Sequence, residues 1–166
     1  MSDVQPYRFE VRDHAADKAA TAYGETLDQV FEAAAYAMFD IMIDLATVRI
    51  EQEREMRLES PYGEELLQAW LSELLFAFEV EGMVFREFSV RVRCPSAPEQ
   101  TCRRVEAFTE PPGELWRMTG IARGAPFSER IERRGAAVKA VTYHNFALRP
   151  PPAPGGDWVA EKVFDV

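Results

Sequence analysis

Two stretches of the chain repeat apolar residues at the spacing of an α-helix. The first follows Thr26-Leu27-Asp28-Gln29, a capping-box sequence, and predicts an amphipathic helix over 26–43. The second begins after Ser60-Pro61, a favourable helix start, and ends at Gly82, a favourable helix stop. The apolar positions are Val30, Phe31, Ala34, Met38, Phe39 and Met42 in the first, and Leu66, Leu67, Trp70, Leu71, Leu74, Leu75 and Phe78 in the second. Each helix therefore has an apolar side that another layer must cover.

Shorter stretches alternate apolar and polar residues, as half-buried strands do. We expect strands over 7–12, 19–23, 48–58, 85–92, 104–109, 115–123, 137–149 and 157–166. The Pro-rich segment at about 94–114 predicts a loop insertion. Strands and helices do not alternate steadily, so we predict an α+β fold in a single domain over 1–166, with two helices on one face of a largely antiparallel sheet.

Length and composition exclude several classes of protein. A chain of 166 residues that is 47% hydrophobic fits one ordinary globular domain. No apolar run approaches the ~20 residues of a membrane span, and Met1–Arg12 lacks the pattern of a signal peptide, so we expect a soluble cytoplasmic protein with no membrane partner. Cys94 and Cys102 lack the further ligands of a zinc site, which leaves free thiols or a disulfide across this loop.

Charge is unevenly distributed along the chain. The formal net charge is −9, and residues 1–85 carry 18 acidic against 6 basic side chains. Residues 86–166 carry 10 acidic against 13 basic side chains. A dedicated duplex-binding protein needs a concentrated basic surface, so we expect no strong direct binding of nucleic acid.

Candidate chemistry is concentrated in two acidic segments. The nucleotide-binding, metalloprotease and serine-hydrolase motifs GxGxxG, GxxxxGK[ST], HExxH and GxSxG are absent. Asp13-His14-Ala15-Ala16-Asp17 follows the first expected strand, and Phe164-Asp165-Val166 ends the sequence. Their oxygen atoms suit Ca²⁺ or Mg²⁺ if the tail folds back against the first loop. Lys139, within an apolar run, either faces water or pairs with these acids.

Several blocks along the chain together resemble archease, an accessory protein of RNA ligation. His14-Ala15-Ala16-Asp17 resembles the family's opening His-Thr-Ala-Asp motif. The match at Val138-Lys139-Ala140-Val141-Thr142-Tyr143-His144 is the most specific, and the ending Val163-Phe164-Asp165-Val166 follows it. Further blocks in family order are Tyr23–Leu27, Phe31–Ala34, Met42–Leu45, Trp70–Leu75 and Glu81–Phe85.

This resemblance implies an α+β fold with a divalent-cation site, calcium in the family, with Mg²⁺ or Mn²⁺ as alternatives. The implied ligands are Asp17, Asp165 and a main-chain or terminal oxygen of Val166. Other polar positions that match the family, and that would support the site or contact a partner, are His14, Asp44, Lys139 and His144. Lys18 departs from the family pattern, and its ammonium beside Asp17 would weaken cation binding.

The resemblance further implies a role that is not catalytic in itself. Archease promotes guanylylation and multiple turnover of the RtcB-type RNA ligase in tRNA splicing or RNA repair. A second hypothesis is a chaperone-like modulator of a tRNA methyltransferase. A third is a small metal-dependent phosphohydrolase using Asp13, Asp17 and Asp165 with His14 as acid or base, although two-metal hydrolases need more ligands than these.

Overall fold

The computed structural model describes residues 7–14, 17–104, 113–141 and 146–166. The helices are α1 (Leu27–Met42), α2 (Gly63–Glu81) and the short α3 (Pro98–Thr101), with a 3₁₀ turn, η1, at Leu45–Thr47. The strands are β1 (Arg8–His14), β2 (Asp17–Gly24), β3 (Gln52–Ser60), β4 (Met83–Arg93), β5 (Trp116–Pro126), β6 (Ala147–Arg149) and β7 (Trp158–Phe164).

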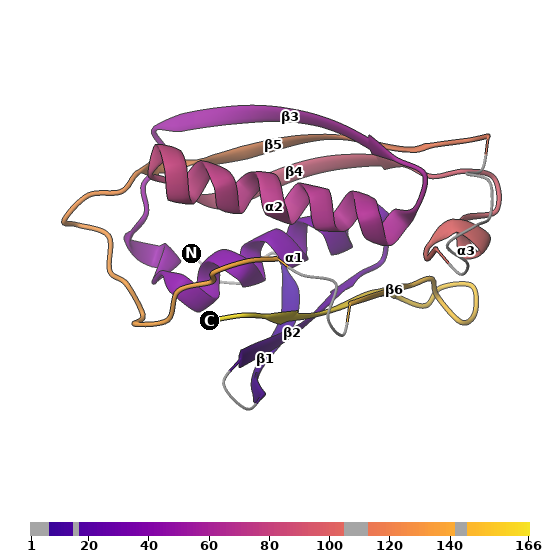
Figure 1. The fold of residues 1–166 in the computed structure, drawn as a ribbon, viewed down its shortest axis with the longest axis horizontal. Helices are drawn as coiled ribbons and strands as arrows, with labels where there is room; N and C mark the ends of the chain where they lie inside the picture. The colour runs from indigo at the N-terminus through magenta and orange to yellow at the C-terminus, as the bar shows by residue number, and fades with distance from the viewer. Residues whose placement is uncertain (1–6, 15–16, 105–112, 142–145) are drawn as a thin grey trace.

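The strands form two antiparallel sheets with α1 between them. The sheets have the orders β1-β2-β7-β6 and β3-β5-β4. Helix α1 contacts β2 and β4, and α2 packs against the three-stranded sheet and β6 (Figure 1). The predicted α+β class is confirmed, but the strands form two sheets instead of one. The reason lies in α1, whose buried residues run around most of its circumference, so it needs cover on two sides.

The ends of both long helices follow local sequence signals, with one difference. The Thr26 hydroxyl accepts a hydrogen bond from the Gln29 N–H at 3.2 Å, and the Gln29 side chain accepts from the Glu25 N–H at 2.8 Å. Gly82 ends α2 at a left-handed φ of 69°, as predicted. Ser60, however, is the last residue of β3, and α2 begins two residues later than Pro61.

The second half of the chain differs more from the sequence expectation. Of the strand predicted over 137–149, only β6 and an isolated bridge between Ala140 and Asp165 are present in the described residues. The Gln68 side chain donates to the Val141 carbonyl at 3.1 Å, which ties this segment to α2. The Pro-rich segment holds α3, and most of the strand predicted over 104–109 lies outside the described residues. Both cysteines are free thiols.

The core fills the space between the layers. Its largest fully buried side chains include Trp70, Trp116, Phe31, Phe39 and Phe85. The indole N–H of Trp70 donates to the Phe31 carbonyl at 3.2 Å, which joins α2 to α1 inside the core. The central strands and helices therefore form a well-packed frame that fixes the positions of β2 and β7.

Candidate functional site

The first hairpin and the last strand bring the two predicted acidic segments together. β2 and β7 are antiparallel, with Lys18 opposite Phe164. Asp17 and Asp165 are the next residues at this end of the pair. The two residues directly adjoin the last residue pair of the two strands, Lys18 and Phe164. The two carboxylates that the sequence singled out thus belong to the same end of one strand pair.

A third segment reaches this end of the sheet. The backbone N–H of Lys139 donates to the Asp165 carbonyl at 2.7 Å, and Ala140 forms a bridge with Asp165. The Lys139 side chain is exposed and forms no ion pair within the described residues. The water-facing interpretation of Lys139 therefore holds, while its backbone anchors the chain just before Val166.

Lys18 lies beside Asp17 in sequence but pairs with another carboxylate. Asp13 is opposite Lys18 in the β1–β2 register, and the Lys18 ammonium forms an ion pair with it. Successive side chains of a strand point to opposite faces, so the ammonium and the Asp17 carboxylate leave the sheet on different sides. Asp17 takes part in no ion pair among the described residues. The electrostatic conflict expected from the sequence is therefore reduced.

The two carboxylates offer oxygen ligands at this end of the sheet. Asp17 is half-buried and Asp165 is exposed, and two carboxylates suit a hard cation such as Ca²⁺. The described residues contain no group of three or more His, Cys, Asp or Glu side chains positioned to hold a metal ion. Because Ca²⁺ takes six to eight oxygen ligands, main-chain oxygens and water would have to supply the rest. The residues thus fit a partly hydrated, hard-cation site.

The two histidines among the remaining candidates differ in what the structure describes of them. His14 ends β1 opposite Asp17. His144 lies outside the described residues.

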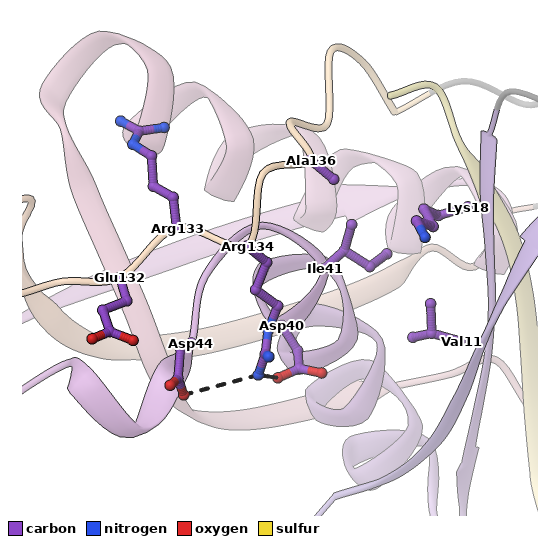
Figure 2. A pocket seen from close by; sticks show the side chains of 9 residues that line it. All are labelled: Val11, Lys18, Asp40, Ile41, Asp44, Glu132, Arg133, Arg134 and Ala136. Atoms are coloured by element: carbon purple, nitrogen blue, oxygen red, sulfur yellow. Dashed lines mark hydrogen bonds and ion pairs between the residues drawn. The ribbon is translucent and has the colours of Figure 1, made fainter.

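Asp44 lines a separate cavity of about 650 Å³ between the β1–β2 hairpin, the end of α1 and residues 132–136 (Figure 2). Its carboxylate accepts from the Ala46 N–H at 3.2 Å and so caps η1. Arg134 lies between Asp40 and Asp44, at 3.1 Å and 3.9 Å (Figure 2). Lys18 also lines this cavity, so Asp44 and the hairpin share one hollow surface.

Sequence reasoning missed Arg134 and Asp40. The Arg134 side chain donates to the Ile43 carbonyl at 3.1 Å, and its backbone N–H donates to the Met42 carbonyl at 2.8 Å. These bonds satisfy carbonyl groups at the end of α1, whose last turn has no basic residue of its own. The charged run Glu132-Arg133-Arg134 before Gly135 was the only available signal.

Lys162 is a second residue that the sequence did not single out. Its side chain is on the inner face of β7, and the residue is 5% exposed. The ammonium is 5.4 Å from the centre of the Phe146 ring and 5.8 Å from that of Phe164. Burial lowers the pKa of Lys162 to about 8. The alternating pattern of this strand did not indicate that Lys162 is buried, because a lysine in such a pattern normally faces water.

The comparison with known proteins decides the family. The model of the Archease protein family (MTH1598/TM1083) matches residues 9–166. The chain belongs to the archease family. It is 38% identical to protein archease of Methanosarcina mazei over 162 residues, which cover 98% of each chain. It is 30% identical to protein archease of Pyrococcus abyssi over 159 residues, or 96% of this chain and 99% of the other.

A solved archease-family structure supports the same conclusion. The solution structure of Methanobacterium thermoautotrophicum protein 1598 superposes with a TM-score of 0.70 at 32% identity. The match covers 95% of this chain and 98% of the other. Membership of the archease family supports an accessory role for this protein. In the described part of the chain, no helix has the length and apolar character that crossing a membrane requires.

Proposed function

We propose that this protein binds a divalent cation at the Asp17–Asp165 end of the β2–β7 pair and activates an RtcB-type RNA ligase in the cytoplasm. The observation that carries the proposal is the β2–β7 register, which brings two carboxylates from opposite ends of the sequence to one sheet end. Family membership over residues 9–166 supports the accessory role. In this role the protein promotes guanylylation and multiple turnover of the ligase in tRNA splicing or RNA repair.

The chain's own residues would hold the cation and leave part of its surroundings open. Asp17 and Asp165 contribute negative charge, and an oxygen of Val166 is a further donor. Ca²⁺ is the first candidate, with Mg²⁺ and Mn²⁺ as alternatives, because these three residues offer oxygen atoms. Bound there, a divalent cation supplies positive charge that can offset the charge developing in phosphoryl transfer. A site with few protein ligands leaves positions for water or for a partner's phosphate group.

Neighbouring residues favour contact with a protein partner. Lys139 is exposed, and its backbone is bonded to Asp165, so a partner that reaches the carboxylates also meets this ammonium. Asp44 and Lys18 line the cavity on the other side of the hairpin. We propose that Lys139 contacts the ligase directly, whereas Asp44 acts by holding Arg134 and η1 in place.

The test combines cation binding with ligase guanylylation. Asp17→Asn and Asp165→Asn each remove one charge with little change in shape. Asp157→Asn is the matched control, because Asp157 pairs with Arg8 at the opposite end of the same sheet. Calorimetric titration with Ca²⁺, Mg²⁺ and Mn²⁺ measures binding, and transfer of labelled GMP to the ligase measures activation.

We expect Asp17→Asn and Asp165→Asn each to weaken cation binding at least tenfold and to slow guanylylation, with Asp157→Asn close to wild type. Unchanged binding and activation in both site variants would contradict the proposal. Activation of a tRNA methyltransferase without any effect on the ligase would favour the chaperone-like alternative. Turnover of phosphoesters by the protein alone would favour a hydrolase.

A further inference from the structure

The outer face of the β3-β5-β4 sheet separates its charges along the strands. Buried residues of these strands, such as Met56, Phe88 and Met118, point toward the helices, and the alternate residues point to solvent. The cross-strand register groups the outward residues into four rows, which are Glu53–Arg123–Glu87, Glu55–Ile121–Ser89, Arg57–Thr119–Arg91 and Glu59–Arg117–Arg93. The first two rows carry three acids and one arginine, and the last two carry four arginines and one acid.

The four arginines of the last two rows, here called the arginine face, are all exposed to solvent. The side chains of Arg57 and Arg117 are 79% and 64% exposed. Arg117 lies 3.8 Å from Glu59, a loose pair on the surface. Arg91 and Arg93 form no ion pair or hydrogen bond with any described residue. Arg57 is paired with Glu55 at 2.9 Å, so Arg91 and Arg93 are the two guanidinium groups of this face that no described carboxylate neutralises.

We infer that the arginine face binds the phosphate backbone of a single nucleic acid strand. Guanidinium groups form paired hydrogen bonds with phosphate oxygens. Residues two apart on a strand are separated by about 6.8 Å, and neighbouring strands by about 4.8 Å. Arg93 and Arg117 are direct neighbours across the sheet and Arg91 is two residues from Arg93, so three guanidinium groups lie close together at this end of the face. A regular polyanion can meet several of them at once.

The chemistry of this face indicates backbone contact without base recognition. Its outward rows hold no aromatic side chain on which a base could stack. The acidic rows begin one row away from Arg57 and Arg91 and repel a polyanion that runs along the strands. A bound strand therefore crosses the sheet over the arginine rows. Binding should be weak and salt-dependent, which agrees with the absence of strong binding expected from the overall charge.

The arginine face is independent of the proposed cation site. It belongs to the other sheet and points away from the helices, whereas Asp17 and Asp165 lie at the end of the β1-β2-β7-β6 sheet (Figure 1). The two proposals can therefore fail separately. A protein bound at the cation site would leave the arginine face open to an RNA strand.

The experiment measures anisotropy of a labelled 20-nucleotide poly(U) strand with the full-length protein at several salt concentrations. Arg91→Glu/Arg93→Glu reverses two charges of the arginine face. Arg49→Glu/Arg130→Glu is the matched control, because these two exposed arginines lie elsewhere and give the same net charge. Arg91→Gln/Arg93→Gln is a milder variant, and thermal melting verifies that each variant folds. A DNA strand of equal length and a polyglutamate of equal charge complete the set.

We expect poly(U) binding at 50 mM salt that weakens at least tenfold in Arg91→Glu/Arg93→Glu and less than threefold in the control. The slope of log K against log salt should fall by about 1.4, or about 0.7 per lost phosphate contact. Similar binding of the DNA strand would assign the site to the shared phosphate backbone, and preference for poly(U) would add contacts to the ribose hydroxyl. No binding of either strand, equal losses in both double reversals, or tighter binding of polyglutamate would overturn the proposal.

Discussion

The effect of a single residue on the proposed cation site depends on which face of the sheet its side chain occupies. Asp17 and Lys18 are adjacent, yet their side chains leave β2 on opposite faces, and Lys18 pairs with Asp13. The ammonium is thus partly neutralised before it can act on a cation at Asp17. Its remaining effect is a long-range one, exerted across the sheet.

Removal of Lys18 should therefore strengthen cation binding moderately. A unit charge about 7 Å from a divalent ion costs about 1 kcal/mol in a water-like medium, or about fivefold in affinity. We expect Lys18→Met to raise Ca²⁺ affinity by about that factor in calorimetric titration. Asp13→Asn should have the opposite effect, because it leaves the Lys18 charge unpaired. A cation affinity that is the same in both variants would show that Lys18 does not act on the site.

Lys162 predicts a pH dependence of stability. Burial lowers its pKa to about 8 in the folded protein, against 10.5 as its ordinary value. Between these two pH values the unfolded chain binds more protons than the folded protein, so folding becomes more favourable as pH rises. Below pH 8 the cost of the buried charge is present in full, and above about 10.5 it is gone.

The measurement compares urea unfolding of wild type and Lys162→Met between pH 7.5 and 10.5. The free energy of unfolding of wild type should rise relative to the variant by on the order of 2 kcal/mol. Lys139→Met removes an exposed lysine and should follow the wild-type curve. If the free energies of unfolding of wild type and Lys162→Met changed in parallel with pH, the lowered pKa of Lys162 would be wrong.

At the scale of secondary structure, α1 protects the free edge of a sheet. β4 is an edge strand, and its outward N–H groups at Val90 and Val92 donate to Glu32 at 2.8 Å and Asp28 at 2.7 Å. These carboxylates satisfy backbone donors that would otherwise be open to another strand. Burial raises the pKa of Glu32, while its bond from Val90 acts in the opposite direction.

Replacement of Glu32 separates the hydrogen bond from the charge. Glu32→Gln keeps an acceptor for the Val90 N–H and should change the free energy of unfolding by less than about 1 kcal/mol. Glu32→Leu leaves that N–H without its partner and should cost about 1–3 kcal/mol. Chemical denaturation measures both effects, and light scattering should detect association of Glu32→Leu through β4. Equal stability of the two variants would mean that the acceptor contributes nothing.

The sequence predicted elements better than their arrangement. α1 was predictable because Thr26, Gln29 and the apolar repeat are local signals, and the cap geometry agrees. The segment around 138–141 resembled a strand because it is rich in β-forming residues, but a long-range bond from Gln68 holds it to α2. At the candidate site, composition identified Asp17 and Asp165. Their position at the same end of the β2–β7 pair depends on a pairing across more than 140 residues, which no local pattern contains.

At the scale of the whole molecule, the two sheets need direct connections besides their shared contact with α1. Tyr7, just before β1, supplies one. Its hydroxyl donates to the Phe88 carbonyl at 3.2 Å and accepts from the Phe88 N–H at 3.0 Å. Its ring lies 4.9 Å from that of Tyr36 on α1. Tyr7 therefore joins the start of one sheet to the free edge of the other.

Tyr7→Phe should weaken this connection without removing the ring contacts. The Phe88 N–H and carbonyl would both lose the hydroxyl, at a cost of about 1–3 kcal/mol in the free energy of unfolding. Tyr23→Phe is a suitable control, since Tyr23 lies on the outer face of β2. Urea denaturation measures the loss, and amide hydrogen exchange localises it. Faster exchange is expected at Phe88 and along β1, because the edge of one sheet and the first strand of the other are released together. A stability equal to that of Tyr23→Phe would show that the shared packing on α1 is sufficient to hold the sheets.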